Sequence, residues 1–171
     1  GQDLNTYDES LDEHLLEQLK LLRLSPTDFL IGAFLIDSLD DNGYFTQSPS
    51  VIVEALKNQY PNLDIEEDEV LMMLSHIQQF DPIGVGATSL EESLILQIKH
   101  LDPAPYWQEE AIDLLRYHSK WLMQHELKRI EKHYYFLEEE VVEMLEGFKR
   151  LNPYPAVNYS KEKVEAVKPD V

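Results

Sequence analysis

The amino-acid sequence predicts an all-α protein made of two small helical bundles, about five helices followed by about three. Three observations support this fold class. Apolar residues recur at helical spacing behind capping residues along most of the chain. The segment 29–39 is apolar on nearly every side, as expected of a buried central helix. A short proline-containing connection at 102–105 separates the two groups of helices. We therefore expect helical subdomains at residues 1–101 and 106–155, followed by an irregular tail at 156–171.

The first predicted helix covers about residues 11–24. It opens with Ser10 and Glu13, which have the spacing of a capping box, and its leucines recur on one face. The second helix begins at Ser25-Pro26, with proline in the first helical position, and contains the apolar segment. We expect this second helix to be the centre of the first bundle.

Three further helices complete the predicted first bundle. The third starts at Ser48-Pro49, the fourth is capped by Asp64 with Glu67 three residues later, and the fifth is capped by Ser89. The third and fourth are joined by a short turn, so a helix-turn-helix shape is possible. The fourth helix opens with consecutive carboxylates, which repel phosphate, so reading of DNA by this pair is not expected.

The turn that ends the second helix, residues 40–44, has two open interpretations. Gly43 fits the left-handed position that follows a helix. A calcium loop is excluded because its first and twelfth ligand positions would be Ser38 and Pro49. The exposed side chains are either partner contacts or serve only to shape the turn. The candidate partner-binding residues are Asp40, Asp41, Asn42 and Tyr44.

A second corner, residues 80–89, joins the fourth and fifth predicted helices. Asp81 and Pro82 stop the incoming helix, while Gly84 and Gly86 permit backbone angles that other residues disfavour. The glycine spacing approaches a dinucleotide fingerprint, but Ser89 replaces the third glycine and a helix precedes the segment instead of a strand. We expect a structural turn here, formed by Asp81, Pro82, Gly84 and Gly86 together with Gly43.

The second bundle shows no catalytic or metal-binding pattern. Residues 106–130 fit one bent helix or two short ones, and the last helix runs from about 137 to 151. His118, His125 and His133 are seven and eight residues apart, which corresponds to about 10 to 12 Å between neighbours along a continuous helix. One ion cannot span that distance, so no metal site is predicted. No nucleophile, phosphate-loop or serine-histidine-acid motif is present in the sequence, so we predict neither a catalytic residue nor a cofactor.

Composition restricts the possible partners. The 171 residues carry a formal net charge of -19, and residues 25–100 hold thirteen acids against two bases. We expect no direct nucleic-acid binding by residues 25–100, since phosphate contacts need Lys and Arg; a basic protein surface fits better. The absence of cysteine indicates a reducing cytoplasm. The longest apolar run is far shorter than the roughly 20 residues that cross a bilayer, so no membrane association is expected.

Four phrases of the sequence resemble the core-binding region of RNA polymerase sigma-54 factors. They are I-D-S-L-D-D-N-G-Y at 36–44, I-Q-Q-F-D-P-I-G-V-G-A at 77–87, L-I-L-Q at 94–97 and L-N-P-Y-P at 151–155. The match covers nearly the whole chain in the right order. Three positions depart from the family: Thr88 stands where arginine is common, and Tyr154 and Ala156 replace the usual lysine and glycine.

The resemblance implies a non-catalytic domain of a bacterial transcription initiation factor that binds core RNA polymerase. It further implies that promoter DNA and an ATP-hydrolysing activator are partners of the full-length protein, of which this would be an excised middle domain. We expect the first subdomain to carry the main polymerase contact. The alternative is an acidic helical protein-protein adaptor from an unrelated pathway.

Overall fold

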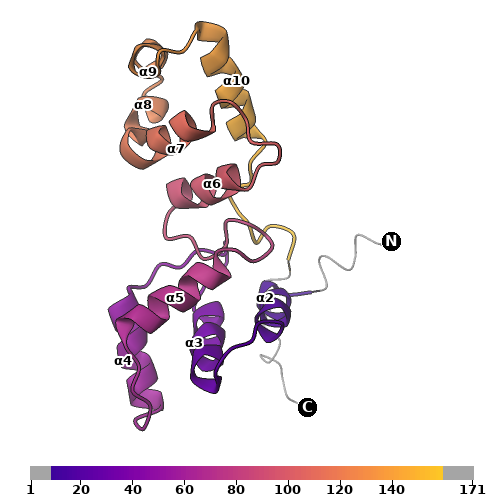
Figure 1. Ribbon diagram of the computed structural model, residues 1–171, viewed down its shortest axis with the longest axis vertical. Helices are drawn as coiled ribbons and strands as arrows, with labels where there is room; N and C mark the ends of the chain where they lie inside the picture. The colour runs from indigo at the N-terminus through magenta and orange to yellow at the C-terminus, as the bar shows by residue number, and fades with distance from the viewer. Residues whose placement is uncertain (1–8, 160–171) are drawn as a thin grey trace. The chain divides into compact units, whose positions relative to one another are not determined.

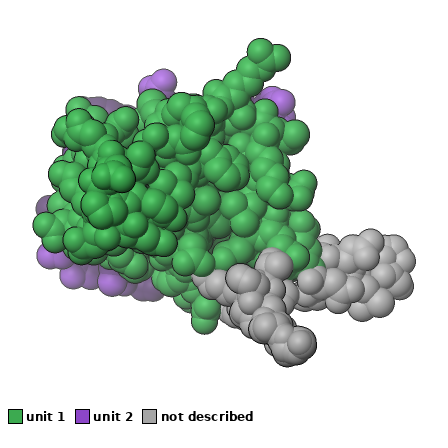
Figure 2. Space-filling view, turned by 90° about the horizontal axis from the view of Figure 1, so that it is seen from below, with its two compact units in different colours: residues 1–88, 154–171 green, residues 89–153 purple. Residues whose placement is uncertain are grey.

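The computed structural model describes residues 9–159, and this part of the chain contains nine α-helices and no strands (Figure 1). The prediction of an all-α protein is therefore confirmed. The chain forms two compact units (Figure 2). Of the described residues, 9–88 and 154–159 belong to unit 1, and 89–153 form unit 2. Each unit has its own hydrophobic core.

Unit 1 contains four helices: α2 (Leu11–Lys20), α3 (Pro26–Asp37), α4 (Pro49–Gln59) and α5 (Glu67–Ile77). Their starts follow local capping chemistry. Ser10 and Glu13 form the expected reciprocal pair, each backbone N–H donating to the other's side-chain oxygen. The hydroxyls of Ser25 and Ser48 cap α3 and α4 ahead of their first-turn prolines.

The α3 helix packs against both α2 and α5, and its Ile31, Leu35 and Ile36 are completely or almost completely buried. Gly32 allows this close packing. A Cβ at that position would lie 2.8 Å from Leu19 Cδ1 and 3.1 Å from Met73 Cε, so any larger residue would push the neighbouring side chains away. The apolar segment is thus the centre of this bundle.

The start of α5 differs from the sequence-based expectation. The N-cap residue is Glu66 rather than Asp64, and the Glu66 N–H donates to Glu69 Oε1 at 2.8 Å. Ile65, which lies between the two candidates, is completely buried. Burial of this side chain in the core of unit 1 accounts for the later start, since the chain must bring Ile65 inward before the helix begins.

Unit 2 contains five helices: α6 (Leu90–Lys99), α7 (Gln108–Tyr117), α8 (Ser119–Met123), α9 (Leu127–Tyr134) and α10 (Glu138–Lys149). Its core surrounds Trp107, whose ring meets Phe148 edge-on with centroids 5.9 Å apart. Gln97 holds the chain leaving α10. Its Nε2 donates to the Asn152 carbonyl at 2.7 Å, and its Oε1 accepts from the Asn152 N–H at 2.8 Å.

The structure divides the chain at different residues from those expected. The proline segment 102–105 lies inside unit 2, because Ile95 and Ile98 of α6 share one core with Trp107 and the helices beyond. The chain also returns to unit 1 at residue 154, where Ala156 is buried in the first core. The sequence pattern suggested a boundary between the units at the proline segment. The residues that share each hydrophobic core place the boundary at 88–89 and 153–154 instead.

We predict that Gly147→Ala destabilises unit 2 by roughly 1–3 kcal/mol, although alanine ordinarily strengthens a helix by about 0.5–1 kcal/mol. A Cβ at Gly147 would overlap the indole of Trp107, which is itself buried. Urea unfolding followed by tryptophan fluorescence measures the change. The matched control is Glu146→Ala at the neighbouring exposed position, which should stay within about 0.5 kcal/mol of the original chain. A Gly147→Ala chain at least as stable as the original would contradict this packing.

Candidate functional site

The two turn motifs singled out in the sequence meet in unit 1. The Gly86 N–H donates to the Gly43 carbonyl, and the Phe45 N–H donates to the Ala87 carbonyl, both at 2.8 Å. Gly43, Gly84 and Gly86 have φ angles of 88°, 111° and 78°, in the region that favours glycine. Residues more than forty positions apart are therefore joined through their backbones.

The 40–44 turn is organised by one carboxylate. Asp40 Oδ1 accepts hydrogen bonds from the backbone N–H groups of Asn42 and Tyr44, both at 2.9 Å. The backbone of Asp40 also exchanges hydrogen bonds with Gly43 and Tyr44, at 2.9 Å each. This carboxylate is half-buried, whereas the side chains of Asp41 and Asn42 are exposed. The four candidate partner-binding residues are thus close together, but Asp40 shapes the turn that presents its neighbours.

The 81–86 corner is held on both sides by amide side chains. Gln18 of α2 donates to the Asp81 carbonyl at 2.6 Å and accepts from the Asp81 N–H at 2.8 Å. The Asp81 carboxylate lies 2.9 Å from His14 Nε2, and the Asp81–Pro82 peptide bond is cis. From the other side, Gln78 Nε2 donates to the Gly86 carbonyl at 2.9 Å. The corner therefore positions both α2 and the end of α5.

The exposed part of the 40–44 turn forms one wall of a shallow groove of about 240 Å³, which we call the loop groove. Asp41 and Asn42 line one part of it, and Tyr154 and Val157 line the rest. Tyr154 and Val157 are each about half exposed, at 53% and 54%. Carboxylate, amide and apolar groups are thus combined in one open concave surface, which suits a protein partner better than a small molecule.

Sequence reasoning missed the contribution of the returning chain to the loop groove. It treated residues from 156 onward as an irregular tail, yet Ala156 is only 5% exposed and lies beneath the turn. A Cβ built on Gly43 would be 3.7 Å from Ala156 Cβ. The sequence did contain a signal that this segment is partly buried: Tyr154, Ala156, Val157 and Tyr159 lie close together, and solvated tails are usually poor in apolar and aromatic residues.

The histidine spacing argument is wrong because its assumption of a continuous helix fails. The segment breaks at His118 and again near His125, so α7, α8 and α9 fold back on one another. The rings of His118 and His133 have centroids only 5.0 Å apart. Asp113 lies in the same group, with ligand atoms of the three residues all within 4.8 Å of one another.

The titratable groups with shifted pKa values are not suited to acid-base catalysis near neutral pH. A hydrogen bond to Glu143 raises the pKa of Tyr106 to about 12. Burial and a hydrogen bond to Asp113 raise the pKa of Tyr134 above its ordinary range, and burial raises the pKa of Tyr159. A catalytic base or nucleophile is tuned toward neutrality, whereas these hydroxyls are held in the protonated form.

Within residues 9–159, no helix combines the length and apolar character that a membrane span requires.

Comparison with known proteins agrees with the four sequence phrases at 36–44, 77–87, 94–97 and 151–155. The family described as "Sigma-54 factor, core binding domain" matches residues 2–171. The chain is 39% identical over 163 residues to the RNA polymerase sigma-54 factor of Azotobacter vinelandii, covering 95% of this chain and 32% of that protein. It is 34% identical over 174 residues to the sigma-54 factor of Acinetobacter guillouiae, covering 99% of this chain and 36% of that protein.

The similarity extends to relatives with lower sequence identity. The chain is 30% identical over 163 residues to the RNA polymerase sigma-54 factor of Escherichia coli K12, covering 95% of this chain and 33% of that protein. The chain spans about a third of the length of these relatives. Because the family match covers residues 2–171, the resemblance noted in the sequence phrases is confirmed. The chain belongs to the sigma-54 factor core-binding domain family.

Proposed function

We propose that this chain binds core RNA polymerase as the core-binding domain of a bacterial sigma-54 transcription initiation factor. The observation that carries the proposal is the family match over residues 2–171. The domain acts by binding and performs no reaction of its own. In the whole protein, which works in the cytoplasm, promoter DNA and an ATP-hydrolysing activator are further partners.

The charge distribution supports a protein partner with a basic surface. Residues 25–100 carry thirteen acids and two bases, and these acids belong mainly to unit 1. An acidic surface speeds encounter with a basic one and disfavours nucleic acid at the same site. The binding is therefore sensitive to ionic strength, since salt screens exposed charges beyond about 8–10 Å.

Within unit 1, the loop groove is the part of the surface best suited to a specific contact. Asp41 and Asn42 offer polar groups that can pair with a basic partner, and Tyr154 and Val157 offer apolar area beside them. Tight interfaces usually combine a few buried anchors with surrounding polar contacts, and tyrosine is frequent among the anchors. Tyr44 is half-buried, and its backbone N–H donates to Asp40 Oδ1 within the turn.

This assignment gives the candidate residues different roles. The Asp40 carboxylate is occupied by two backbone N–H groups, so it acts by positioning the turn. Asp41 and Asn42 face solvent and are the residues we expect a partner to touch. The residues 81–86 act indirectly, through the backbone hydrogen bonds that attach this corner to the turn.

The direct test is the affinity of the chain for purified core polymerase. We expect Asp41→Lys to weaken binding at least tenfold at low salt, because it reverses a charge in the loop groove while leaving the fold intact. The matched control is Glu54→Lys, the same charge change at an exposed position of α4. Fluorescence anisotropy of labelled chain, repeated across salt concentrations, measures both. Equal losses for the two variants would show that only total charge matters, and no binding by the folded original chain would favour an unrelated adaptor.

A second prediction concerns stability. Asp40→Ala removes the acceptor of two backbone hydrogen bonds, so we expect a loss of about 2 kcal/mol from the free energy of unfolding of unit 1. Asp40→Asn keeps a side-chain oxygen in the same place and should recover at least half of that loss. Asp41→Lys should leave stability nearly unchanged. Chemical denaturation followed by circular dichroism compares the free energies of unfolding of these chains. An Asp40→Ala chain as stable as the original would contradict the proposed role of Asp40 in positioning the turn.

A further inference from the structure

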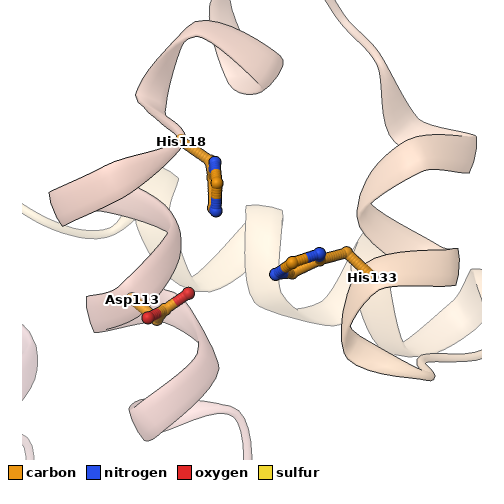
Figure 3. A group of neighbouring side chains, drawn as sticks. All are labelled: Asp113, His118 and His133. Carbon is orange, nitrogen blue, oxygen red and sulfur yellow. The ribbon is translucent and has the colours of Figure 1, made fainter.

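Unit 2 brings together a group of side chains of types that bind metals, whereas the loop groove belongs to unit 1. Asp113 comes from α7, His118 from the junction of α7 and α8, and His133 from α9. Figure 3 shows the carboxylate and both imidazole rings directed toward one shared space. We propose that these three residues bind a divalent transition-metal ion, with Zn²⁺ as the best-fitting ion.

The donor set selects the class of metal. Two imidazole nitrogens and one carboxylate oxygen suit zinc and its transition-metal neighbours, whereas calcium and magnesium prefer oxygen ligands alone. Zinc binds nitrogen and oxygen at about 2.0–2.2 Å, which places the donors of a tetrahedral site about 3.3 Å apart. The three donors already lie within 4.8 Å of one another, so small side-chain rotations close the site. A water molecule would take the fourth position.

The neighbouring side chains hold the three ligands in place. The Tyr134 hydroxyl donates to Asp113 Oδ2 at 2.6 Å, which orients the carboxylate. The His118 ring stacks on Trp121 with centroids 3.9 Å apart and planes 9° from parallel. His133 meets the same indole edge-on at 5.1 Å. Such supporting contacts fix ring orientation around metal sites and increase metal affinity.

The competing interpretation is an anion site. Arg129 and Lys132 line the same cavity of about 350 Å³ as the two histidines, and cations there would oppose a metal ion. However, the Arg129 guanidinium packs over Trp121 at 4.6 Å and pairs with Glu126 at 3.3 Å, so its charge is partly balanced. Asp113 would repel an anion held by the histidines. A carboxylate directed at two imidazoles favours the cation.

A bound ion would fasten helices that otherwise share few contacts. Asp113 lies in the middle of α7, His118 follows the last residue of α7, and His133 lies in α9, which comes after the short α8 in the chain. Because the site is complete only in the folded unit, binding energy would appear as folding stability of unit 2. The ion therefore has a structural role, independent of the polymerase contact proposed for unit 1.

The test is titration of Zn²⁺ into the untagged 171-residue chain by isothermal calorimetry. We expect one zinc ion per chain. His118→Ala, His133→Ala and Asp113→Asn should each weaken binding more than tenfold, and Tyr134→Phe about tenfold through the lost orienting bond. The matched control is His125→Asn, which keeps a residue tolerant of the left-handed φ of 55° found there and should bind zinc as the original chain does.

Histidine side-chain NMR of the unmodified chain provides a second readout that does not depend on how the variants fold. Added Zn²⁺ should shift the imidazole resonances of His118 and His133 and leave those of His125 and His100 in place. The proposal is overturned if no saturable zinc binding occurs at 100-fold excess of metal, if other histidines respond instead, or if the ligand variants bind as tightly as the original. If the chain instead binds inorganic phosphate saturably and does not bind zinc, the anion site is the correct interpretation and the metal site is wrong.

Discussion

The arrangement of unit 1 depends on two backbone hydrogen bonds between turns that are distant in sequence. Gly86 donates to Gly43, and Phe45 donates to Ala87. The two glycines that take part have positive φ angles, which residues with a side chain rarely adopt. The turn after α3 and the corner after α5 are thus joined through their backbones, and Asp41 and Asn42 of this turn line the loop groove. A partner that reads Asp41 and Asn42 therefore meets a preorganised surface, which lowers the entropic cost of binding.

The helices were predictable because the signals that start them are local. Ser10 with Glu13 and the serine-proline pairs before α3 and α4 act within three residues, so the sequence alone reveals them. The exceptions depend on distant contacts. Burial of Ile65 in the core moves the start of α5, and the shared core of Ile98 and Trp107 places α6 in unit 2. Neither core could be inferred from spacing along the chain.

The candidate sites show the same division between local and distant information. The sequence pointed to Asp40, Asp41, Asn42 and Tyr44 together, but only the hydrogen bonds separate a residue that shapes the turn from residues that face solvent. Tyr154 and Val157 were missed because they reach the groove from more than a hundred residues away. The group of Asp113, His118 and His133 was missed because two breaks turn a linear spacing into a cluster.

The return of the chain to unit 1 after residue 153 has a consequence for biosynthesis. Ala156 and Tyr159 belong to the first hydrophobic cluster, and Ala156 lies beneath Gly43. On a ribosome, all the residues of unit 2 are made before these last pieces of unit 1 emerge. The core of unit 1 is therefore completed only after all of unit 2 has been synthesised. Until then the core of unit 1 lacks the side chain of Ala156, which packs close to Gly43 in the folded chain.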